Sequence, residues 1–217
     1  HTPGRPLFAV MRCADRTPRG MTFGAKPGEN QRWSILSHDK LKAALTPLLS
    51  EAGFARFPLY NERLVAGRRE DIVVFATDEI AADEITRSVN GVVAVTCMGG
   101  QREIGKTSLA SVLDRQIVVI PRVGINAVAD ARAINAAIHK ARLERGACQV
   151  TPPPVKVAFL PDSLPEGWQV GDPKPETSLE YSEEANSFDD LLSIRALVRS
   201  AVVILSLLRI SGPTRPY

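Results

Sequence analysis

The fold is decided by residues 71–96, DIVVFATDEIAADEITRSVNGVVAVT. Two short apolar runs rich in Val, 72–76 and 92–96, flank a stretch whose apolar residues have helical spacing. A short β-branched run is typical of a strand buried on both faces, and a helix between two such strands joins them in parallel. These residues therefore predict a strand, a helix and a second, parallel strand.

The same alternation continues to residue 160. Apolar runs predict further strands over 117–120 (IVVI) and 157–160 (VAFL). Helical spacing predicts a short helix over 107–113 and a long one over 127–145, ended by Gly146. The chain is therefore predicted to contain an α/β domain, with a parallel sheet flanked by helices on both faces.

The segments around this domain follow other patterns. The first 35 residues predict a small antiparallel meander, followed by a helix from near Ser37 and a connector over 58–67. After residue 160 the chain becomes rich in Pro and acidic residues, which is typical of an extended linker. A last helix is predicted from Ser187 and includes the apolar stretch 201–208, which would dock on its own domain or join copies into a homo-oligomer.

Composition places the chain among globular proteins. Its 217 residues are 44% apolar and 24% charged, which excludes a wholly disordered or collagen-like chain. The net charge of +3 is unevenly spread, because residues 1–70 hold 12 Lys and Arg against 6 Asp and Glu, whereas the remainder holds 15 against 18. A basic first third suits a polyanion such as nucleic acid, although arginines scattered on a solvated surface give the same count.

The cysteines indicate neither a disulfide framework nor a zinc site. Cys13, Cys97 and Cys148 lie far apart, and Cys97, at the end of an apolar run, is predicted to be a buried thiol. The longest apolar stretch, 201–208, is far shorter than the roughly 20 residues that span a bilayer, and no signal-peptide pattern is visible. We expect a cytoplasmic protein without a membrane partner. Because the chain opens at His1, we also expect a piece of a longer protein.

One glycine-rich segment fits a phosphate-binding pattern. Residues 100–107, GQREIGKT, match G-x-x-x-x-G-K-[ST] between a predicted strand and a predicted helix. In a nucleotide-binding protein of this kind, the loop with Gly100, Gly105 and Lys106 would hold phosphates, and Thr107 would bind Mg²⁺. The next predicted strand, however, ends in Pro121-Arg122 and lacks the acidic residue that positions the metal.

A series of landmarks over residues 58–172 points to a family. They are PLYN at 58–61, AAD at 81–83, MGG at 98–100, GK at 105–106, Arg115, LP at 160–161 and LPEGW at 164–168. With these landmarks the chain resembles the Toprim domain of phage- and plasmid-type DNA primases and primase-helicases. The first 57 residues resemble, less specifically, the small domain that precedes it.

The resemblance implies a fold and a division of the chain. It implies a Rossmann-like parallel sheet over 58–172 and a small basic α+β subdomain over 1–57, which leaves the linker and last helix over 173–217. In the family, carboxylates hold the divalent metal for phosphoryl transfer. The family's four acidic positions fall here on Thr77, Arg122, Gly124 and Gln169.

The resemblance therefore implies a domain that has lost its catalytic acids. We expect a non-catalytic protein of a phage or plasmid replication system, without a cofactor, in which Arg102, Lys106 and Arg122 gather at the carboxyl edge of the sheet and bind phosphate. The partner would be DNA, RNA or a replication or helicase protein. A purely structural remnant, the nucleotide-binding protein, and a primase or nuclease with Mg²⁺ ligands relocated to Asp78 and Glu79 stay open as alternatives.

Overall fold

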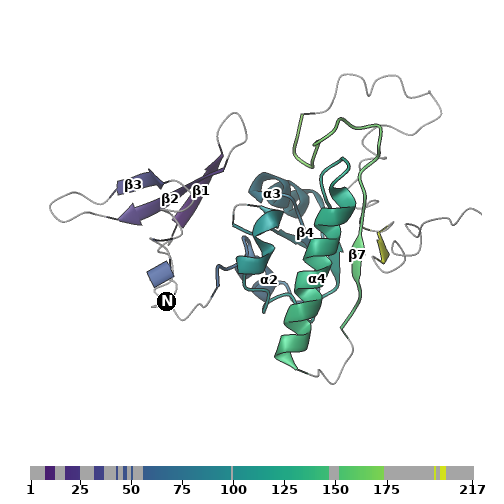
Figure 1. The fold of residues 1–217 in the computed structure, drawn as a ribbon, viewed down its shortest axis with the longest axis horizontal. Coiled ribbons are helices and arrows are strands. Elements are labelled where there is room, and N and C mark those ends of the chain that lie inside the picture. The colour runs from purple at the N-terminus through teal and green to yellow at the C-terminus, as the bar shows by residue number, and fades with distance from the viewer. Residues whose placement is uncertain are drawn as a thin grey trace, which may run out of the picture. The chain divides into compact units, whose positions relative to one another are not determined.

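The computed structural model describes a defined part of the chain, namely residues 8–12, 18–24, 32–36, 43, 46–47, 50, 56–98, 100–146, 152–173, 198 and 201–203. The chain divides into two compact units, His1–Pro58 (unit 1) and Leu59–Tyr217 (unit 2), which are described separately (Figure 1).

Unit 1 contains a three-stranded antiparallel sheet. Its strands β1 (Phe8–Arg12), β2 (Pro18–Gly24) and β3 (Arg32–Leu36) pair in that order. In register, Met21 of β2 lies between Ala9 and Ile35. The helix predicted from Ser37 falls mostly outside the described residues.

Unit 2 is built on a five-stranded sheet with the order β5-β4-β6-β7-β8. The first four strands are parallel, and β8 pairs antiparallel with β7. Unit 2 is therefore an α/β fold, as the alternating sequence predicted. The strands are β4 (Ile72–Phe75), β5 (Val92–Val95), β6 (Ile117–Val119), β7 (Val155–Val157) and β8 (Val202–Val203).

Helices cover both faces of this sheet (Figure 1). Alternate side chains of the strands pack on one face against α4 and its neighbours, and on the other face against α3. No helix in the described ranges is long and apolar enough to cross a membrane. The helices are α2 (Glu62–Gly67), α3 (Glu79–Ser88), the 3-10 helix η1 (Gln101–Lys106) and α4 (Ala127–Arg145).

Three predicted elements differ from the structure. The short helix predicted over 107–113 is wrong, because these residues form turns, although Leu109, Val112 and Leu113 are buried as their spacing indicated. The last parallel strand begins at Val155, two residues before its predicted start. The C-terminal helix is wrong at Val202 and Val203, which form β8, and the rest of that prediction falls almost entirely outside the described residues.

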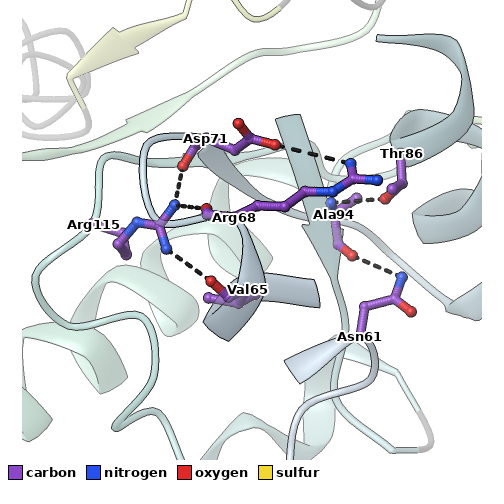
Figure 2. Close-up of polar contacts among 7 residues, drawn as sticks. All are labelled: Asn61, Val65, Arg68, Asp71, Thr86, Ala94 and Arg115. Atoms are coloured by element: carbon purple, nitrogen blue, oxygen red, sulfur yellow. Dashed lines mark hydrogen bonds and ion pairs between the residues drawn. The ribbon is translucent and has the colours of Figure 1, made fainter. Parts of the chain in front are cut away.

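Strand β5 lies at one edge of the sheet, and its outward-facing backbone groups are bonded by side chains and by the connector. The Ala94 N–H donates to the Thr86 hydroxyl at 2.9 Å, and the Asn61 amide donates to the Ala94 carbonyl at 3.1 Å (Figure 2). The Tyr60 N–H donates to the Thr96 carbonyl at 2.9 Å. An unpaired edge would be a template for another strand, so these contacts protect β5 from edge-to-edge association.

Two arginines bind backbone carbonyls at the amino ends of the parallel strands. Arg115 donates to the backbone carbonyls of Val65, Arg68 and Asp71, which join the end of α2 to the start of β4 (Figure 2). Arg142 donates to backbone carbonyls that precede β6 and β7, and burial lowers the pKa of its guanidinium. Both guanidinium groups are therefore part of the scaffold. The carbonyls that Arg142 contacts belong to Leu113, Arg115 and Pro153.

Substitution of Asn61 tests how much its contact with the β5 edge and its left-handed backbone affect stability. Its backbone is left-handed, with φ of 63°, a conformation that Asn and Gly tolerate and Ala does not. Asn61→Gly should lower the free energy of unfolding by about 1 kcal/mol, because it removes the hydrogen bond to Ala94 and a longer, exposed one of 3.5 Å to Asp83. Asn61→Ala should cost about 1 to 2 kcal/mol more, because it adds backbone strain.

Urea unfolding of the full chain, followed by Trp168 fluorescence in a Trp33→Phe background, measures both variants. Equal stability of the Gly and Ala variants would contradict the account of the left-handed position.

Candidate ligand site at the carboxyl edge of the sheet

The strand order creates a site where neighbouring connections diverge. From β4 the chain passes through α3 to β5 on one side, whereas β6 lies on the other side of β4. Open α/β sheets bind ligands outside the carboxyl ends of strands at such a point. The segments 77–79, after β4, and 121–124, after β6, lie at this edge.

Asp78 holds two elements together at this edge. One carboxylate oxygen accepts a hydrogen bond of 2.9 Å from the Ala81 N–H and so caps α3. The other oxygen accepts from the side-chain amide of Gln169, which comes from the loop after β7. Both side chains are buried, so the carboxylate joins β4, α3 and this loop.

Thr77, where the predicted resemblance would place an acidic residue, is buried. Its side chain is 3% exposed, and its hydroxyl has no hydrogen-bond partner among the described residues. The loop after β5 lies against it, because a Cβ on Gly100 would stand 3.4 Å from the Thr77 carbonyl oxygen. The positive φ of 96° at Gly100 suits glycine, so this glycine allows the close approach of the loop.

Cys97 follows β5, and its thiol is buried. Burial is the main cause that raises the pKa of the Cys97 thiol to about 12, and the negative charges of Glu103 and Glu79 add to it. The prediction of a buried thiol is therefore confirmed. Glu79, the first residue of α3, is buried as well.

Backbone hydrogen bonds join the loop after β6 to the loop after β7. The Val123 N–H donates to the Trp168 carbonyl and the Gly167 N–H donates to the Val123 carbonyl, both at 2.8 Å. A Cβ on Gly124, whose φ is 133°, would collide with the Glu166 carboxylate. Arg122, in contrast, is exposed and forms no ion pair with any described residue.

The three residues predicted to bind phosphate are not shown as a cluster. The Lys106 ammonium pairs with Glu103 at 2.5 Å, one turn away on η1. No contact between described residues joins Lys106 to Arg122, and the side chain of Arg102 lies outside the described part. Arg122 and Lys106 are both exposed, but Lys106 is paired with Glu103, whereas Arg122 forms no ion pair with a described residue.

Residues 100–107 adopt a different geometry from a phosphate-binding loop. Residues 101–106 form η1, and the helix that should follow Thr107 is replaced by turns. Thr107 is 1% exposed, and its hydroxyl donates to the Glu103 carbonyl at 3.1 Å. A Cβ on Gly105 would meet nothing within 4 Å, so space does not require glycine there. This geometry does not favour binding of Mg²⁺-nucleotide at Gly100, Gly105, Lys106 and Thr107.

Two landmark motifs meet in a contact that sequence reasoning missed. The Tyr60 hydroxyl donates to both carboxylate oxygens of Asp83, at 3.0 and 2.9 Å. Burial, together with this hydrogen bond, raises the pKa of Tyr60 to about 12. The PLYN connector and the AAD helix start are thus joined physically. Both motifs were visible in the sequence, but nothing in their spacing indicated that they touch.

The residues at this edge do not suit Mg²⁺, which needs several oxygen ligands of which carboxylates are the strongest. The positions at which the resemblance would place acidic residues hold Thr77, Arg122, Gly124 and Gln169, and both oxygens of Asp78 already accept hydrogen bonds. Within the described ranges, no three His, Cys, Asp or Glu side chains are grouped so that they could hold a metal ion.

Comparisons with family models, with curated proteins and with solved structures find no match for this chain. The resemblance to Toprim domains therefore stays a prediction from the sequence.

Substitution of Asp78 tests its two contacts. Asp78→Ala should lower the free energy of unfolding by about 1 to 3 kcal/mol, because α3 loses its cap and the buried Gln169 amide loses its acceptor. Asp78→Asn keeps an oxygen for the Ala81 N–H and should cost less. Urea unfolding measures both variants, and a neutral Asp78→Ala would contradict the structural role.

The raised pKa of Cys97 predicts a loss of stability in alkali. The folded state keeps the thiol protonated up to about pH 12, whereas the unfolded chain ionises it near its ordinary pKa of 9.0. The unfolded state then binds fewer protons, so the free energy of unfolding should fall as the pH rises through this window. Tyr60 adds a fall of the same sign above pH 10.0.

Urea unfolding at about pH 8 and about pH 10.5 measures this fall. Cys97→Ala should make it shallower than in the parent chain. An equally steep fall in both chains would show that the thiol does not contribute.

Proposed function

We propose that unit 2 is a catalytically inactive Toprim-like domain, with a Rossmann-like sheet, whose carboxyl edge binds the phosphate backbone of nucleic acid in a replication system of the phage or plasmid type. One observation carries the proposal. At the point where the strands diverge, the carboxylate of Asp78 is used to hold α3 and the loop of Gln169, while Arg122 is exposed. A cation thus stands where the family has an acid, and a cation binds phosphate directly.

The distribution of charge favours a local phosphate contact at one arginine of unit 2, because unit 2 as a whole does not attract a polyanion. Unit 1 holds nine Lys and Arg against four Asp and Glu, a net charge of +5. Unit 2 holds 18 against 20, a net charge of −2. The broad electrostatic attraction to a polyanion would therefore come from unit 1, and unit 2 would add a local contact at Arg122.

The geometry weighs against an enzyme with relocated metal ligands. Such a site would draw on Asp78 and Glu79, but Asp78 would have to give up the cap of α3 and the contact with Gln169. Glu79 is buried in the first turn of α3. We therefore propose a binding or scaffold role, in which a replication or helicase protein is a further partner.

Salt-dependent binding tests the proposal. Fluorescence anisotropy of the full chain with labelled single-stranded and duplex DNA should give a linear fall of log affinity with log salt concentration. Arg122→Gln should weaken binding and make the slope shallower by about 1, because one phosphate contact is lost.

Arg63→Gln is the matched control, because Arg63 is also exposed in unit 2 but lies on α2. Equal effects of the two substitutions, or no effect of Arg122→Gln, would sink the proposed edge site.

A further inference from the structure

The loop after β6 presents an apolar side chain to solvent. Ile125 is 90% exposed, the highest value among the exposed large apolar residues of the described chain. Val128, one turn further along in α4, is 37% exposed. Arg122, three residues before Ile125, is exposed as well. An apolar and a cationic side chain therefore share one short loop at the carboxyl edge.

This loop is anchored on both sides of Ile125. Val123 is buried and forms two backbone hydrogen bonds with the loop after β7. On the other side, the Ala127 N–H donates to the Gly124 carbonyl at 3.0 Å, and the Asp130 N–H donates to the Asn126 carbonyl at 2.9 Å. Ile125 is thus held away from the core by a fixed backbone.

Gly124 allows the backbone conformation that exposes Ile125. Side chains other than that of glycine rarely adopt its φ of 133°, and the Glu166 carboxylate lies in the space where its Cβ would stand. A larger residue here would strain the backbone that exposes Ile125, three residues after Arg122. The loop therefore offers an apolar side chain and a cation together.

We infer that Ile125 contacts an unstacked base of single-stranded nucleic acid while Arg122 holds the adjacent phosphate. The inference rests on the proposed function and names the ligand of that site. Apolar side chains in nucleic-acid-binding proteins contact base faces or insert between bases, and single strands leave these faces open. In a regular duplex the bases are stacked, so a duplex would have to be distorted first.

Acidic side chains limit where phosphate can bind near this loop. Glu166 lies beside Gly124, and Asp162 is exposed on the same loop after β7. Because carboxylates repel phosphate, Arg122 is the residue of the loop after β6 that can hold one.

Two substitutions separate the apolar contact from the electrostatic one. Ile125→Ser should weaken the affinity for a single-stranded oligodeoxynucleotide roughly fivefold to tenfold and leave the salt slope unchanged, because no charge is removed. Ile125→Trp should bind at least as tightly as the parent chain, because an indole stacks on bases better than isoleucine. Leu143→Ser is the matched control, since Leu143 is 68% exposed in the last turns of α4.

The outcomes are distinguishable from failure of the proposed function. If Arg122→Gln weakens binding but Ile125→Ser does not, the proposed function stands and the base contact is overturned. If Leu143→Ser weakens binding as much as Ile125→Ser, the position of the contact is overturned. If light scattering shows self-association that Ile125→Ser abolishes without a change in oligonucleotide affinity, Ile125 belongs to a protein interface and the inference fails.

Discussion

Burial of the central strands on both faces is the constraint on which the rest of unit 2 depends. Phe75 packs toward α4 while Val74 packs toward α3, so neither face of the sheet is open to solvent. Only the edges of the sheet and the ends of its strands are left uncovered by this packing. Asn61 and its neighbours close the β5 edge, β8 pairs along β7, and the arginines 115 and 142 hold the amino ends. The carboxyl ends are where open α/β sheets bind ligands.

The central part of the fold could be predicted because its signals are local. β-Branched runs gave β4, β5 and β6, and helical spacing gave α3 and α4. The errors arose where long-range pairing overrides local pattern. Residues 107–113 place their apolar side chains in the core through turns. Val202 pairs with Val157 of the adjacent strand β7, although the sequence pattern around it predicts a helix.

The site could be predicted less well than the fold. Strand ends placed Thr77 and Arg122 at one edge, but the use of Asp78 as a cap and its contact with Gln169 depend on residues 91 positions apart. The phosphate-loop pattern was misleading, because four matching positions do not determine whether Thr107 is exposed. Exposure of Ile125 could not be predicted either, since it follows from the anchoring of Val123 by a loop distant in sequence.

The central claim is that the loop after β6 binds nucleic acid without metal chemistry. The most direct measurement is an NMR titration of the isotope-labelled full chain with a short single-stranded oligodeoxynucleotide, without added divalent metal. The account predicts saturable shifts at the backbone amides of residues 122–126, whereas amides beside Arg145 at the opposite edge stay unchanged. Shifts confined to unit 1, with residues 122–126 unaffected, would contradict it.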